Sequence, residues 1–130
     1  MMEMQETSQI LLHATRKSLV LVDEIGRGTS AREGLALASA ISKHLLTKNQ
    51  SFTLFATHYH ELSACLHPPK ETFPIQYACT EAEIDPINNN LISSPKIKPG
   101  IAKHSYALPV AALAGIPDSV IKDAHTFLNN

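Results

Sequence analysis

The chain lacks several features that would assign it to a protein class at once. Its 130 residues contain no tryptophan and only two cysteines, Cys65 and Cys79. Two cysteines without a framework spacing predict buried thiols in a reducing compartment, not a disulfide scaffold. No apolar run approaches the ~18 residues that a membrane-spanning helix needs. We therefore expect no membrane partner.

An excess of charge of either sign is also absent. The sequence carries 11 basic and 12 acidic residues, for a net charge of −1. No overall field would draw such a chain to nucleic acid, so any contact with DNA has to come from elsewhere. With 44% hydrophobic and 18% charged residues, the composition is that of a globular protein of single-domain size.

Two apolar runs, each followed by polar residues, dominate the first half of the chain. Residues 18–22 are too short for a helix and do not alternate, which is typical of a parallel strand covered on both faces. Residues 52–56 repeat the pattern. Between them, residues 33–46 are amphipathic, with Leu37, Ile41 and Leu45 one turn apart. Strand, helix and strand in this order predict a βαβ unit with a parallel sheet.

The flanking segments complete an α/β pattern. Residues 1–14 have helical periodicity, and residues 67–74 and 85–90 read as a loop and a turn. Alternation at Ile75, Tyr77 and Cys79 predicts a half-buried strand, which we expect to pair in an antiparallel manner with residues 91–98. A short helix should end with Gly115 at its C′ position, and a last helix should start near residue 118.

The stretch "LVLVDEIGRGTS" places Asp23 and Glu24 directly after the first apolar run. A carboxylate pair at the end of a buried strand is costly without a cation beside it or a proton to move. Thr57 and His58 follow the second run in the same way. Because the carboxyl ends of parallel strands meet at one edge of a sheet, we expect the acid pair and His58 to lie together there.

Four apolar residues followed by Asp-Glu resemble the Walker B motif of P-loop NTPases. Together with "LFATHYHEL" and "SYALPVAALAGIP", this motif makes the chain resemble the MutS family of DNA mismatch-recognition ATPases, from about residue 1 to residue 128. The resemblance implies an ABC-type P-loop NTPase fold, of which residues 1–130 would form the C-terminal part. It also implies an ATPase that requires Mg²⁺ and couples ATP binding and hydrolysis to the binding of mismatched DNA.

The resemblance also implies roles for individual residues. Asp23 would hold Mg²⁺ with the nucleotide bound, Glu24 would activate the attacking water, and His58 would sense the γ-phosphate. These three would bind ATP, and Glu24 and His58 would be catalytic. The loop expected at the interface of a homodimer or heterodimer of MutS-type subunits consists of Gly26, Arg27, Gly28, Thr29 and Ser30.

One required element of such an ATPase does not occur in the sequence. There is no G-x-x-x-x-G-K-[ST], the loop that cradles the β- and γ-phosphates. In the family this loop lies upstream of the matched region, as do the domains that contact DNA. The chain is then part of an ATPase and inactive alone, a non-enzymatic remnant or dimerisation partner, or part of a recombination paralogue. We expect an intracellular location: nucleus or mitochondrion in a eukaryote, cytoplasm in a bacterium.

A zinc site is the remaining alternative for the histidines and cysteines between residues 58 and 79. The candidate ligands are His58, His60, Cys65, His67 and Cys79. Their spacing contains no C-x₂₋₄-C pair, and His58 and His60 would point to opposite sides of an extended chain. The sequence therefore disfavours structural zinc.

Overall fold

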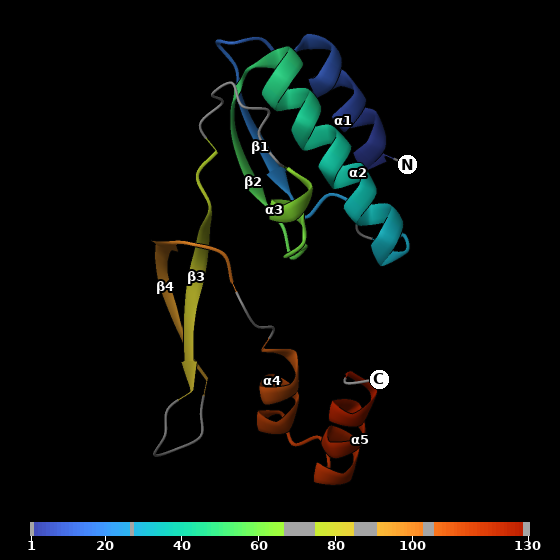
Figure 1. Cartoon of the computed structure of the whole chain (residues 1–130), viewed down its shortest axis with the longest axis vertical. Helices are drawn as coiled ribbons and strands as arrows, with labels where there is room; N and C mark the ends of the chain where they lie inside the picture. The colour runs from blue at the N-terminus through green and yellow to red at the C-terminus, as the bar shows by residue number, and fades with distance from the viewer. Residues whose placement is uncertain (1, 27, 67–74, 85–90, 103–105, 129–130) are drawn as a thin grey trace. The chain divides into compact units, whose positions relative to one another are not determined.

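The computed structural model describes residues 2–26, 28–66, 75–84, 91–102 and 106–128. The chain divides into two compact units, Met1–Ile75 and Gln76–Asn130. The first unit contains α1 (Met2–His13), β1 (Leu19–Asp23), α2 (Ala31–His44), the π-helical turn η1 (Leu45–Asn49), β2 (Phe52–Ala56) and α3 (Leu62–Cys65) (Figure 1). The second contains β3 (Ala78–Ile84), β4 (Leu91–Pro99), α4 (Ala107–Leu113) and α5 (Asp118–Leu128). Within these described segments, no helix is long and apolar enough to cross a membrane.

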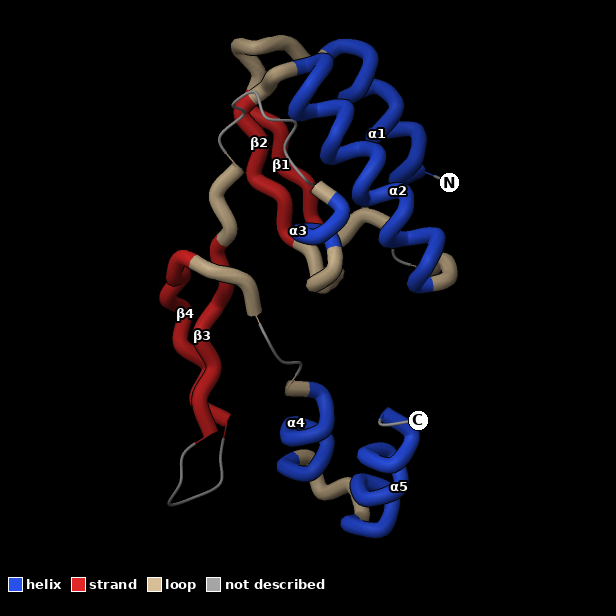
Figure 2. The backbone as a smooth tube through the Cα atoms, viewed as in Figure 1, coloured by secondary structure: helices blue, strands red, loops and turns tan. Residues whose placement is uncertain are grey.

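The predicted parallel strand pair of the first unit is confirmed. Strands β1 and β2 are parallel, in a register that runs from Leu19 opposite Phe52 to Asp23 opposite Ala56. Helices α1 and α2 lie side by side along the same face of this pair (Figure 2). The core between strands and helices consists of Val20, Ile25, Ala38, Ile41, Leu45, Tyr59 and Leu62, with Ile10, Leu11 and Ala14 of the first helical segment packed against it.

The other face of the β1–β2 pair is exposed in the described part of the first unit, so the expected cover is found there on one face. The side chains of Leu19, Leu21, Phe52 and Leu54 are 65–74% exposed. They face the same way because residues two apart on a strand share a face and the register pairs these positions across the strands. The described helices pack only on the opposite face, which carries Val20.

Helix α2 begins after Ser30, and two residues of the expected stripe, Ile41 and Leu45, are buried, whereas the third is not. Ser30 is the N-cap, and its hydroxyl accepts a hydrogen bond from the Glu33 amide at 3.3 Å. The buried residues are Gly34, Ala38 and Ile41, followed by Leu45 in η1. Leu37, which we expected on this face, is 41% exposed. Ala38, one residue after Leu37, takes its place in the stripe, so that a glycine and an alanine face the core.

In the second unit, the predicted antiparallel pair is confirmed and its start is corrected. Strands β3 and β4 pair from Ala78 opposite Pro99 to Ile84 opposite Leu91. Ile75 and Tyr77 thus precede β3, and Tyr77 is 36% exposed. The predicted loop at 67–74 and turn at 85–90 lie outside the described residues.

The two predicted helices at the end of the chain are confirmed. Helix α4 ends at Leu113, and the amide of Gly115 donates a hydrogen bond to the Ala112 carbonyl at 3.0 Å. Helix α5 starts at Asp118, as expected.

Candidate functional site

The acid pair and His58 meet because β1 and β2 end at the same level. Asp23, the last residue of β1, lies opposite Ala56, the last residue of β2. The ladder continues by one bond, since the Glu24 amide donates to the Ala56 carbonyl at 3.0 Å. Thr57 and His58 follow immediately, so the predicted meeting of the two polar motifs at one sheet edge is confirmed.

Glu24 has an unusual backbone conformation that turns the chain at this edge. Its φ of +47° lies in the left-handed region, which residues other than glycine seldom occupy. The turn places the next side chain, Ile25, in the core at 4% exposure, while the carboxylate of Glu24 stays accessible. Such conformations cost energy and concentrate at functional sites, because the surrounding structure has to hold them in place.

The carboxylate of Glu24 lies beside the imidazole of His58. Glu24 Oε1 is 3.8 Å from His58 Nδ1, and the two side chains are 37% and 56% exposed. A pair as accessible as this adds little to stability, even when the imidazole is protonated. The two side chains do face a common solvent-accessible space. There the Glu24 carboxylate can accept hydrogen bonds, and the His58 imidazole can both donate and accept them. Asp23, also exposed, provides a second carboxylate at the strand end.

The loop after the acid pair is tied to two helical glutamates, Glu3 and Glu33. Gly26 has a φ of +87°, and its amide donates to Glu3 Oε1 of α1 at 3.1 Å. Thr29 Oγ1 and Ser30 Oγ donate to Glu33 Oε2 at 2.8 and 2.9 Å. These hydroxyls, that of Thr29 first, hold the pKa of Glu33 below its ordinary value.

The position of Arg27, the remaining distinctive residue of this loop, lies outside the described residues. Ser30 therefore has an established structural use as a helix cap, whereas contact of the loop with a second subunit stays a prediction.

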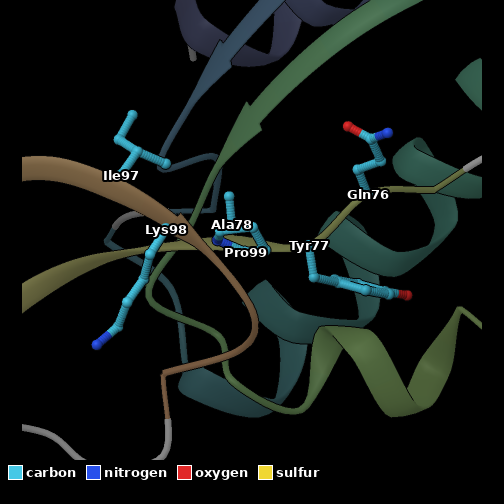
Figure 3. Close-up of a pocket in the computed structure, with 6 residues that line it drawn as sticks. All are labelled: Gln76, Tyr77, Ala78, Ile97, Lys98 and Pro99. Atoms are coloured by element: carbon cyan, nitrogen blue, oxygen red, sulfur yellow. The ribbon is translucent and has the colours of Figure 1, made fainter.

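A hollow in the second unit contains none of the predicted site residues. It measures about 470 Å³ and is lined by Gln76, Tyr77, Ala78, Ile97, Lys98 and Pro99. The Tyr77 ring and the Lys98 side chain point in different directions (Figure 3). Because these polar groups do not converge, the hollow is a weaker candidate than the edge formed by β1 and β2.

The candidate zinc ligands are not assembled where they are described. No group of three or more His, Cys, Asp or Glu side chains in the described part of the chain is arranged to hold a metal ion. His67 lies outside that part. Cys65 is exposed on α3 and Cys79 is partly buried, both as free thiols, so the expectation of two buried thiols is wrong for Cys65.

Three residues that sequence reasoning missed support this edge. Glu3 accepts the Gly26 amide, and Tyr59 is buried at 8% exposure against Gly34 of α2. One signal could have pointed to Gly34, because a lone glycine within a helical pattern often marks a close approach. Nothing in the local sequence identifies the partners of Glu3 or Tyr59.

Comparison with known proteins gives a consistent family match. The family model described as MutS domain V matches residues 1–130. The chain is 48% identical over 128 residues to a DNA mismatch repair protein MutS of Lactobacillus gasseri, covering 98% of the chain and 14% of that protein. It is 44% identical over 124 residues to proteins of the same name from two strains of Treponema pallidum, covering 95% of the chain and 13% of those proteins. The chain thus spans about one seventh of the length of these relatives.

Proposed function

Because the chain belongs to the MutS family, we propose that it contributes the metal-binding and water-activating side of an ATPase site that serves DNA mismatch repair. One observation carries this proposal: the Glu24 carboxylate lies 3.8 Å from His58 at the end of two parallel strands. In α/β sheets, ligands bind outside the carboxyl ends of the strands. The wider fold we propose is the ABC-type P-loop NTPase fold, with this chain as its C-terminal part.

The exposed groups at this edge fit Mg²⁺ and a nucleotide. Mg²⁺ prefers oxygen ligands and is usually held by one or two carboxylates together with substrate phosphates. Asp23 offers such a carboxylate in an exposed position at the end of β1. When bound, Mg²⁺ would neutralise charge on the phosphate oxygens. The loop that cradles those phosphates is missing from this sequence, so the proposal requires a cradle from another part of a MutS-type protein.

Each residue then has a distinct task. Asp23 holds the metal ion, and Glu24 orients a water and accepts its proton. His58, one strand away, donates a hydrogen bond to the γ-phosphate and so distinguishes ATP from ADP. The loop of residues 26–30 contacts a second MutS-type subunit, and mismatched double-stranded DNA binds to other domains. We place this activity inside the cell, where DNA is repaired, and in the cytoplasm if the chain is bacterial.

The first experiment tests the proposed role of Glu24. A chimera, in which this chain replaces the matching segment of the Lactobacillus gasseri protein, restores the length of a complete relative. In the chimera, Glu24→Gln should leave ATP binding within a few-fold of wild type and slow hydrolysis by about 10²-fold or more, because the amide cannot accept the proton. Binding is measured by calorimetry and turnover by phosphate release.

Two controls accompany this measurement. Glu6→Gln, an exposed carboxylate change on α1, should leave turnover unchanged. The 130-residue chain alone should neither bind nor hydrolyse ATP. Turnover of Glu24→Gln within a few-fold of wild type would remove Glu24 from the catalytic role, and a chimera without any turnover would favour a non-enzymatic dimerisation partner.

A second experiment separates His58 from its exposed neighbour His60. His58→Ala in the chimera should abolish the difference in DNA affinity between the ATP and ADP states, because the contact that distinguishes them is lost. DNA affinity without nucleotide should stay the same. His60→Ala is the matched control and should behave as wild type. If His58→Ala still discriminated ATP from ADP, the sensing role would be wrong.

A further inference from the structure

The ring of Tyr59 is seated on a helix position that has no side chain. A Cβ built on Gly34 would overlap the Tyr59 hydroxyl and lie 2.8 Å from its Cζ. The same Cβ would lie 3.2 Å from the carbonyl oxygen of Gly26, and a Cβ on Gly26 would lie 2.9 Å from Gly34 Cα. Three segments therefore meet without room for one more carbon atom: the loop after β1, the first turns of α2 and, distant from both in sequence, the segment after β2.

The backbone around His58 is fixed through Tyr59. The Tyr59 amide donates to Thr57 Oγ1 at 3.0 Å, so a short turn spans His58. The Tyr59 carbonyl accepts the Leu62 amide at 3.1 Å, which ties this turn to α3. The rings of His58 and Tyr59 are also close, with centroids 4.4 Å apart. His58 is exposed and Tyr59 is buried, so the buried ring is the part of this segment that the core holds.

From this packing we infer that Tyr59 is a positioning residue, whose seat on Gly34 fixes His58 opposite Glu24. The inference rests on the proposed ATPase function for its catalytic consequence, but the positioning itself is a geometric statement. It also implies that the segment after β2 and the loop beginning at Gly26 cannot move independently, because Gly34 contacts both.

Gly34→Ala is a selective way to disturb this seat. Gly34 lies within α2, where alanine is a better helix former than glycine. The substitution should therefore favour the helix while pushing the Tyr59 ring out of its place. Tyr59→Leu instead shortens the side chain that contacts Gly34, and the double variant combines the larger helix residue with the smaller partner. Together with wild type, these variants form a double-mutant cycle, which measures the interaction between the two positions.

The experiment uses the chimera and two readouts, one structural and one kinetic. Crystal structures should show His58 Nδ1 moved away from Glu24 Oε1 in Gly34→Ala, relative to the wild-type separation of 3.8 Å. Each single change should lower kcat for ATP hydrolysis by about 10–100-fold with little change in KM, as expected for a catalytic group misplaced by about 1 Å. The double variant should lose less than the product of the two single losses.

Two further variants separate positioning from general stability. Tyr59→Phe keeps the ring and should retain most of the turnover. Leu45→Ala removes a core side chain of 2% exposure away from this contact and should lower the melting temperature without changing kcat. A core change that lowered kcat as much as Gly34→Ala would show that any loss of stability has this effect, and would overturn the inference.

The geometric readout decides the inference even if the proposed function fails. If the wild-type chimera hydrolysed no ATP, the proposed function would be wrong, and the separation of His58 and Glu24 in the variants would still test the positioning. A separation unchanged in both Gly34→Ala and Tyr59→Leu would refute the role of Tyr59, whatever the turnover. Purely multiplicative kinetic losses in the double variant would refute it as well.

Discussion

Gly26 and Gly28 provide a matched pair for testing how tightly the loop after the acid pair is held. Both have positive φ, +87° and +93°. They differ in their surroundings, since a Cβ on Gly26 would lie 2.9 Å from Gly34 Cα, whereas a Cβ on Gly28 would meet no atom within 4 Å among the described residues beyond its chain neighbours. Alanine is strained at either position because of the positive φ, and alanine at position 26 would also have to displace the backbone of Gly34.

The expected magnitudes follow from these two costs. Gly28→Ala should destabilise the fold by about 1–2 kcal/mol, because a left-handed conformation is unfavourable by this amount for a residue with a Cβ. For Gly26→Ala, the crowding adds about 1–3 kcal/mol, so that the total is about 2–5 kcal/mol. In a unit of this size, each kcal/mol lowers the melting temperature by about 4–8 °C.

Urea denaturation of the 130-residue chain, followed by circular dichroism, measures both variants against wild type. The slope of the transition should stay the same, so that a lower midpoint reports stability alone. Equal losses for the two alanine variants would refute the reasoning, because the contact between Gly26 and Gly34 would then carry no energetic weight. A greater loss at Gly28 would contradict the described geometry outright.

Three further predictions concern the metal ion, Glu33 in the first turn of α2, and the exposed face of the β1–β2 pair. In the chimera, Asp23→Asn should raise the Mg²⁺ concentration needed for ATP binding; unchanged Mg²⁺ dependence in calorimetry would contradict its assignment. Thr29→Val should raise the pKa of Glu33 in an NMR titration, since Thr29 contributes most to lowering it. Because the pKa of Glu33 is lower in the folded than in the unfolded chain, ionised Glu33 stabilises the fold above its unfolded pKa, and this stabilisation is lost as the pH falls through its folded pKa. Thr29→Val should therefore make the folding stability less sensitive to acid. Leu21→Lys with Leu54→Glu should reduce self-association of the isolated chain in sedimentation experiments, because both side chains are 65% exposed on one apolar face; association unchanged by the pair would mean that this face is not responsible.

Features set by local chemistry could be predicted from the sequence. A serine before a helix can satisfy an amide of the first turn with its hydroxyl, and Ser30 does so for the amide of Glu33. Likewise, two apolar runs joined by a helix required a parallel pair, and the pair placed Glu24 and His58 at one edge. In both cases the information lies within a few residues or in a general rule of sheet topology.

Features set by packing between distant segments could not be predicted in this way. Leu37 has the right spacing for a buried stripe, yet Ala38 is fully buried and Leu37 is 41% exposed. A step of three or four residues before the buried Ile41 fits Ala38 as well as Leu37, and only the close approach of other segments selects between them. Here the close approach is that of the Tyr59 ring, which packs against Gly34.

The conformation of Glu24 shows why the site depends on such distant contacts. A left-handed φ is unfavourable for glutamate in isolation, so nothing in the local sequence would select it. It is held by the Ile25 side chain in the core on one side and, on the other, by the hydrogen bond that the Glu24 amide donates to the Ala56 carbonyl. The direction of the carboxylate is therefore a property of the packed unit. For the same reason, we expect truncation of Ile25, the core side chain next to this turn, to alter the geometry between Glu24 and His58 before it alters the fold.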